Sequence, residues 1–73
     1  MQHGTKAALR LIVNGQELTL QADNLGELLL HLGIDSHAVV AEVNAAIVAP
    51  EKFSSTGLTD GDRIELVRFV GGG

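Results

Sequence analysis

Residues 8–22, ALRLIVNGQELTLQA, contain the local signal that decides the fold. Asn14 and Gly15 are the preferred pair for a two-residue type I′ hairpin turn, because both turn positions need a positive φ. A turn here pairs Val13 with Gln16 and fixes the register of both strands. That register puts four leucines on one face: Leu9, Leu11, Leu18 and Leu20. The stretch therefore predicts an amphipathic hairpin whose apolar face another element must cover.

The next segment predicts the helix that covers this face. Asn24 is a residue type that caps helix starts, and Glu27 three residues later completes a capping-box pattern. Gly33 stands where a left-handed residue ends a helix. Apolar residues recur at i, i+3, i+4 and i+7, as on one face of a helix: Leu25, Leu28, Leu29 and Leu32.

Residues 38–50, AVVAEVNAAIVAP, predict a second hairpin. β-branched and small residues flank a turn at about Asn44 and Ala45. Pro50 limits how far the returning strand can pair, since proline lacks the amide donor.

The remaining chain predicts a short connection and a last strand. The polar stretch 51–59 allows one short helical turn, anchored by Phe53 and Leu58. Asp-Gly-Asp at 60–62 is typical of a tight turn. A strand over about 63–70 follows it.

The predicted order of elements is β-β-α-β-β-β within a single domain over 1–73. One helix across one face of a mixed sheet, in this order, is the ubiquitin-like β-grasp arrangement of the α+β class. We expect the first and last strands to lie parallel in the centre of the sheet. We also expect a loose lead-in over 1–7 and a flexible tail over 70–73.

Composition narrows the classes of function. The 73 residues include no cysteine and 45% hydrophobic residues, so an aliphatic core must stabilise the chain without disulfides or thiolate metal sites. A net charge of −4 with five scattered basic residues argues against nucleic acid as a partner. The apolar runs are too short for a membrane span and the start lacks a signal-peptide pattern, so we expect a cytoplasmic protein.

The ionisable side chains predict no catalytic or metal site. Asp60 and Asp62 are interpreted as turn residues, and Asn44 as a residue that tolerates a left-handed turn position. Surface positions are expected for the histidines, which have no ligand or triad spacing: His3, His31 and His37.

The terminal glycines remain as the candidate reactive part. Gly71, Gly72 and Gly73 precede the α-carboxylate, and three successive glycines are rare when average usage is about 7%. Without Cβ atoms they pass through a narrow channel easily, and residues 70–73 span about 13–14 Å when extended. An adenylating enzyme can turn such a carboxylate into an acyl-adenylate. We interpret the terminus as functional, the alternative being a frayed end.

Four segments together resemble a known family, the ThiS sulfur carriers of thiamine biosynthesis. The resemblance covers about residues 9–73, and the ordered set is more specific than any single motif. The segments are VNGQELTL, NLGELLLHLGI, AVVAEVNAAIVAPEKF and LTDGDRIELVRFVGGG.

The resemblance implies a protein cosubstrate that is not itself an enzyme and binds no cofactor. A ThiF-like partner would use ATP and magnesium to adenylate Gly73, and sulfur from a persulfide donor would then give a Gly73 thiocarboxylate. Thiazole synthase would accept the tail and take up the sulfur. Gly71 and Gly72 would form the narrow lead into partner active sites. Phe69 and Val70 are candidate partner contacts, or they simply end the last strand.

Several alternatives remain open at this point. The small subunit of molybdopterin synthase shares the fold and a Gly-Gly thiocarboxylate. Other sulfur carriers feed cysteine synthesis or transfer-RNA thiolation. A ubiquitin-like modifier that conjugates to lysines, or an interaction module with an inert tail, belongs to a different class.

Overall fold

The computed structural model describes residues 7–69 and contains every element that the sequence predicts. One 3₁₀ turn, η1, was not predicted. Of the expected lead-in only Ala7 is described, and the expected tail over 70–73 lies outside the described residues. The elements are β1 (Leu9–Val13), β2 (Gln16–Leu20), α1 (Leu25–Leu32), η1 (Ser36–Ala38), β3 (Val39–Val43), β4 (Ala46–Val48), η2 (Pro50–Ser55) and β5 (Arg63–Arg68).

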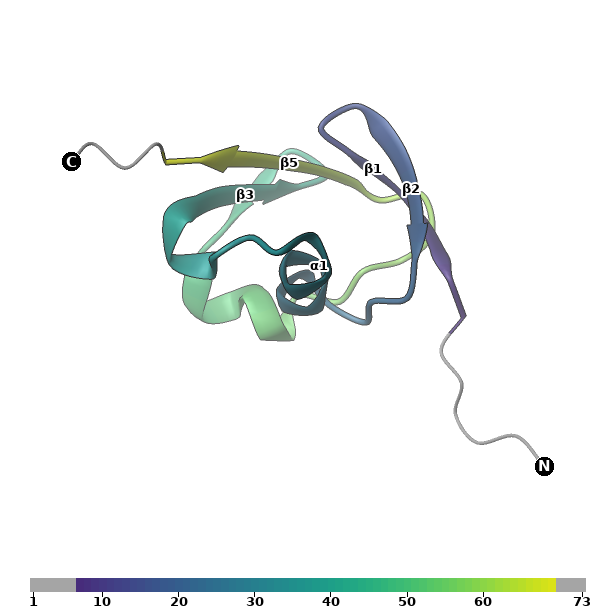
Figure 1. Cartoon of the computed structure of the whole chain (residues 1–73), viewed down its shortest axis with the longest axis horizontal. Coiled ribbons are helices and arrows are strands. Elements are labelled where there is room, and N and C mark those ends of the chain that lie inside the picture. Colours follow the sequence, from purple (N-terminus) through teal and green to yellow (C-terminus); the bar gives the residue numbers. More distant parts are fainter. Residues whose placement is uncertain (1–6, 70–73) are drawn as a thin grey trace.

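The five strands form one mixed sheet in the order β2-β1-β5-β3-β4. β1 and β5 are parallel, with Ile12 opposite Arg63, while the other neighbours are antiparallel. α1 lies across one face of the sheet (Figure 1). This arrangement confirms the predicted ubiquitin-like β-grasp fold, with the first and last strands side by side in the interior of the sheet.

The first hairpin has the predicted register. Val13 pairs with Gln16, and the turn residues Asn14 and Gly15 have φ values of 50° and 82°. Leu11 is fully buried, and the other three leucines of the face pack against the core: Leu9, Leu18 and Leu20.

α1 begins and ends at the predicted caps, with one difference in the bonding. The Asn24 side chain accepts a hydrogen bond from the Glu27 amide at 2.9 Å. The Glu27 carboxylate accepts from the amide of Asp23, one residue before the cap, at 2.8 Å. Gly33 ends the helix in the left-handed region, with φ 69°. The bond from the Glu27 amide satisfies a donor that the first helical turn leaves without an intrahelical partner.

The core fills the space between α1 and the sheet. η2 closes one side of it, and the predicted anchors Phe53 and Leu58 are both buried. α1 contacts η2 at Gly26, where a Cβ would be in ordinary contact with the Ser54 backbone at 3.6 Å but only 3.2 Å from the capping oxygen of Asn24. The buried residues that complete the core are Leu11, Val13, Ala22, Leu25, Leu28, Leu29, Val39, Ala41, Ile64 and Leu66.

The second hairpin turns at Asn44 and Ala45, as predicted, with φ values of 51° and 73°. The Asn44 side chain does more than tolerate this turn. Its oxygen accepts from the Arg63 amide at 3.0 Å, and its nitrogen donates to Asp62 at 2.9 Å. Asn44 therefore also fixes the start of β5.

The turn before β5 confirms the structural interpretation of its two carboxylates. Gly61 has φ 89°. Asp60 accepts a hydrogen bond from the Arg10 amide at 2.7 Å, and Asp62 accepts from the Thr59 amide at 2.8 Å. Partial burial alone raises the pKa of Asp62, but hydrogen bonds from Asn44 and Thr59 outweigh it and lower the pKa below its ordinary value of 3.8.

Replacing Asp62 with asparagine is expected to destabilise the fold in a pH-dependent way. Because the folded pKa is depressed, the carboxylate stabilises the fold above the unfolded pKa and loses this effect as the pH falls through the folded pKa. At pH 7 we expect Asp62→Asn to cost roughly 1 kcal/mol, since this partly solvated carboxylate loses charge-assisted hydrogen bonds. The difference from the wild type should shrink below about pH 4. Urea unfolding of both proteins between pH 3 and 7 measures this, and a constant difference would contradict it.

The last strand is shorter than the predicted 63–70. β5 ends at Arg68, which pairs with Val39 at the first position of β3. The residues before Val39 form η1, so β3 has no further residue with which β5 can pair as a strand. One more hydrogen bond follows, from the Phe69 amide to the Ala38 carbonyl at 2.9 Å.

Candidate functional site

The candidate site is the carboxyl end of β5, from which the glycine tail continues. The side chain of Asn14, in the β1–β2 turn, holds this end of the strand. Its oxygen accepts from the Leu66 amide at 2.7 Å, and its nitrogen donates to the Leu66 carbonyl at 3.1 Å. These bonds continue the β1–β5 pairing by one step, because the Asn14 amide itself donates to the Ile64 carbonyl. Asn14 thus positions the strand that leads to the tail.

Replacing Asn14 with glycine should separate its turn role from this second role. Glycine accepts the positive φ of the turn, but both side-chain bonds to Leu66 are lost. We expect a cost of about 1–2 kcal/mol and faster hydrogen exchange at the Leu66 amide. Unfolding curves and exchange followed by NMR test this. Unchanged exchange at Leu66 would show that the side chain does not hold β5.

The described part of the predicted site is exposed and apolar. Phe69 is 58% exposed, just beyond β5, and Val67 lies on the sheet face opposite α1. Val40 is paired with Val67 and shares that face, and Ile47 lies on it beside Glu42. The other predicted site residues lie outside the described residues: Val70, Gly71, Gly72 and Gly73. The base of the tail therefore adjoins an uncovered apolar surface.

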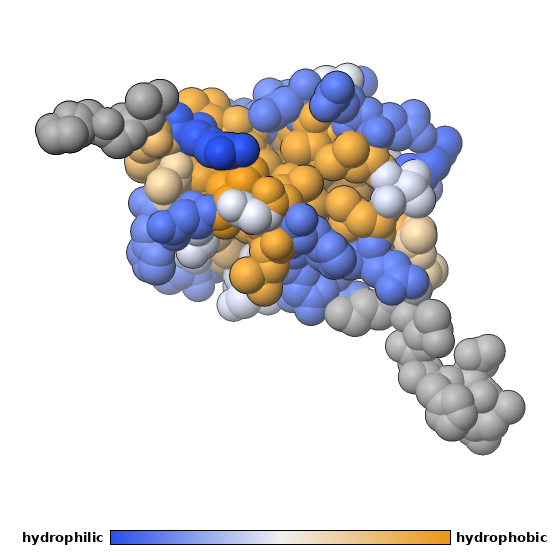
Figure 2. All heavy atoms as spheres, in the orientation of Figure 1, coloured by the Kyte–Doolittle hydropathy of each residue, from blue (hydrophilic) through white to orange (hydrophobic). Residues whose placement is uncertain are grey.

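A hollow of 320 Å³ lies on the other face, between the β1–β2 hairpin, α1 and β5. The sequence did not lead us to predict this hollow. A signal was present, because the predicted last strand is longer than the predicted first strand and so extends beyond it. Figure 2 shows apolar side chains gathered over this region. The lining residues are Val13, Asn14, Gln16, Leu18, Leu32, Ile34, Leu66 and Arg68.

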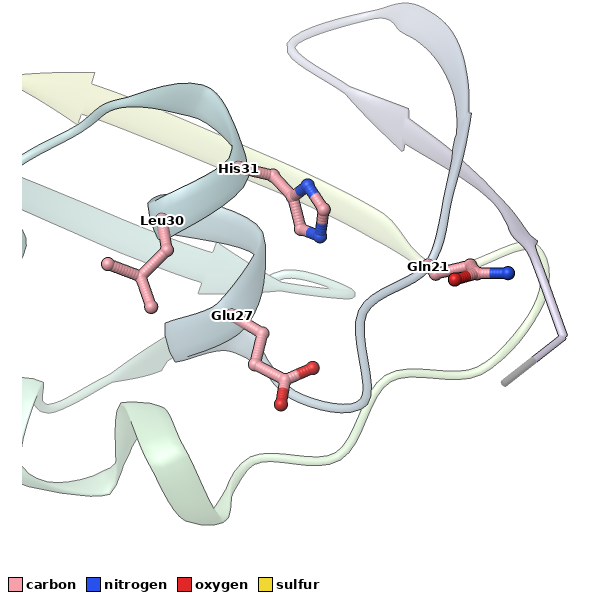
Figure 3. Close-up of a pocket in the computed structure, with 4 residues that line it drawn as sticks. All are labelled: Gln21, Glu27, Leu30 and His31. Carbon is pink, nitrogen blue, oxygen red and sulfur yellow. The ribbon is translucent and has the colours of Figure 1, made fainter. Parts of the chain in front are cut away.

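A second hollow lies along the outer side of α1. Figure 3 shows Glu27 and His31 on the side of the helix nearer to Gln21, while Leu30 points away from them. Leu30 is 80% exposed, and Glu27 is engaged with the Asp23 amide. The carboxylate and imidazole therefore belong to a capped surface helix and not to a paired acid–base site.

The other ionisable groups also have structural environments. The backbone amide and ring of His37 lower the pKa of the exposed Asp35. His31 and His37 lie on the surface as predicted, and His3 lies outside the described residues. Within residues 7–69 no group of three or more histidine, aspartate or glutamate side chains is placed to hold a metal ion. None of the helices in that range has the length and hydrophobicity that crossing a membrane requires.

Comparison with known proteins places these features in a family. A sulfur carrier protein ThiS of Bacillus subtilis is 34% identical over 65 residues, which are 86% of this chain and 98% of that protein. A thiazole synthase of Paramagnetospirillum magneticum is 39% identical over 66 residues, which are 89% of this chain. This chain spans only 20% of that longer relative.

Solved structures agree with the sequence relatives. The crystal structure of a thiamine biosynthesis protein, ThiS, from Geobacter metallireducens has a TM-score of 0.75 and 36% identity. The similarity covers 89% of this chain and 100% of that one. The model of the ThiS family matches residues 7–73. The chain therefore belongs to the ThiS family.

Proposed function

We propose that this chain is a sulfur carrier in thiamine biosynthesis and that Gly73 carries the sulfur as a thiocarboxylate. The observation that best supports this is the similarity to the Bacillus subtilis sulfur carrier protein ThiS over 98% of its length. The described residues support this indirectly, because their ionisable side chains stabilise turns, cap helices or lie on the surface. The chain is then a protein cosubstrate whose chemistry is carried out by its partners.

The proposed chemistry has three steps. A Gly73 carboxylate oxygen attacks the α-phosphorus of ATP and displaces pyrophosphate, in a ThiF-like enzyme that supplies the magnesium. The terminal sulfur of a persulfide donor then attacks the acyl carbon and displaces AMP, which gives an acyl disulfide. A second thiol reduces that disulfide and releases the thiocarboxylate. The carrier contributes only its carboxylate, since it contains no cysteine.

Thiazole synthase is the proposed acceptor of this sulfur. A relative of that name contains a segment similar to this chain, within a protein about five times as long. A carrier and its acceptor in one chain meet at high effective concentration. This supports the same pairing between separate chains.

The test is the intact mass of the protein after incubation with a ThiF-like enzyme, ATP, magnesium and a persulfide donor. We expect one oxygen to be replaced by one sulfur, and fragmentation to place the change at Gly73. Omission of ATP is the control. A mass that stays unchanged with an enzyme that is active on another ThiS protein would refute the proposal.

A further inference from the structure

The two edges of β5 differ in how much of their backbone is hydrogen-bonded to a neighbouring strand. Toward β3 the strand is paired along its whole length, since Arg68 is opposite Val39 and the Phe69 amide donates to the Ala38 carbonyl. Toward β1 the backbone pairing stops early, because β1 ends at Val13. β5 therefore extends past its parallel neighbour, as Figure 1 shows.

The last residue of β5 has its main-chain groups on this unpaired edge. Successive residues of a strand direct their amide and carbonyl groups to alternate sides. The Asp62 and Ile64 carbonyls accept bonds from the amides of Ile12 and Asn14, and Leu66 binds the side chain of Asn14. Arg68 has the same parity, so its N–H and C=O face the same side. Within residues 7–69 no group bonds to them there.

The hollow of 320 Å³ adjoins this edge. Its apolar lining comes from three directions: β1 and β2, the end of α1, and β5. The Arg68 side chain also borders it, and no ion pair of Arg68 exists within the described part of the chain. The edge thus combines a backbone donor and acceptor that have no partner within residues 7–69, a hollow lined by both apolar and polar side chains, and a cation.

We propose that the adenylating enzyme adds an extended segment to β5 at this edge. The inference rests on the proposed function. The segment pairs its main chain with Arg68, places one aliphatic side chain in the hollow, and brings a carboxylate to the guanidinium. The β1–β2 turn at Asn14 closes one end of the unpaired edge, so the segment extends from Arg68 away from that turn.

Charge and geometry favour this occupant. Strand addition to an open edge is a common way to bind an extended partner, with backbone bonds for affinity and pockets for specificity. Although the net charge of the chain is −4, the charged group at this edge is the cationic side chain of Arg68. An acidic segment therefore complements the edge. A second copy fits less well, because two edges paired around Arg68 place like charges together.

Backbone hydrogen exchange tests the proposal in the wild-type protein. In the free protein the Arg68 amide should exchange fast and the Phe69 amide slowly, since only Phe69 is bonded to Ala38. In complex with a ThiF-like enzyme from the same organism, exchange at Arg68 should slow at least tenfold. Unchanged exchange at Arg68 in a saturated complex would overturn the proposal. Protection that rises with protein concentration alone would also overturn it, by assigning the edge to a second copy.

Two substitutions of Arg68 are compared by calorimetric titration with the same enzyme. Arg68→Pro removes the guanidinium together with an amide that β3 does not use, so binding should weaken by more than the roughly fivefold expected for one lost hydrogen bond. Arg68→Glu should weaken binding by about tenfold or more, with a smaller salt dependence. Lys52→Glu makes the same charge change in η2 and should stay within roughly twofold of the wild type. Equal binding by all variants would contradict the edge site.

The mass assay separates this inference from the proposed function. If the wild type forms the thiocarboxylate and Arg68 stays unprotected, the function holds and the edge proposal fails. If no thiocarboxylate forms but the enzyme binds and protects Arg68, the edge proposal survives without the function.

Discussion

A chain that ends at Gly72 is expected to lose thiocarboxylate formation almost completely, although it still ends in a glycine carboxylate. The loss follows from length. Removing one extended residue withdraws the carboxylate by about 3.5 Å, and a misplacement of even 1 Å can slow an enzymatic step by about a hundredfold. The rate should therefore fall by at least about a hundredfold in the mass assay.

The fold should not change in that variant. The buried residues of the described chain all lie between Leu11 and Leu66, so the melting temperature is expected to match that of the wild type. Gly72→Ala is the matched variant, because it keeps the length and adds one methyl group. Its rate of thiocarboxylate formation shows whether the enzyme requires only a tail of full length or also a tail without a Cβ atom at residue 72. Normal sulfur transfer by the shortened chain would contradict a role for Gly73.

The second large effect concerns stability. Leu28→Ala is expected to cost about 3 kcal/mol or more, because Leu28 is fully buried between α1 and the sheet and its removal leaves a cavity. A domain of this size has about 4–11 kcal/mol of stability in total. The melting temperature should fall by more than about 12 °C. Thermal and urea unfolding both measure this loss.

Leu30→Ala is the control within the same helix. Leu30 is 80% exposed, so its truncation should change the free energy of unfolding by less than about 0.5 kcal/mol. The two substitutions have equal effects on helix propensity, and the comparison isolates burial. A similar cost at both positions would show that α1 does not pack with Leu28 inward.

The sequence predicted the elements whose signals are local. Asn14 and Gly15 determine a turn through their own backbone preferences, and the spacing of Leu25 and Leu28 is a property of one helix. The hairpin register, the helix caps and the central parallel pair were all confirmed. The predicted roles of Val70 and the three glycines remain predictions, because these residues lie outside the described part of the chain.

The side-chain bonds between distant segments were not predictable in the same way. Asn14 and Leu66 are 52 residues apart, and Asn44 meets Arg63 across 19 residues. Each asparagine already had a sufficient local explanation in its turn, so nothing in the sequence pointed to a second role. The unpaired edge at Arg68 was hidden for a related reason, since it depends on the relative lengths of two strands that pair only after folding.

The parallel orientation of β1 and β5 has a practical consequence. Leu9 opens β1 at one end of the sheet, and Arg68 closes β5 at the other (Figure 1). A dye, an affinity tag or a surface anchor attached ahead of β1 will stand a sheet length away from the carboxyl end of β5. The protein can thus be immobilised or labelled through its amino-terminal side while the carboxyl end of β5 stays accessible.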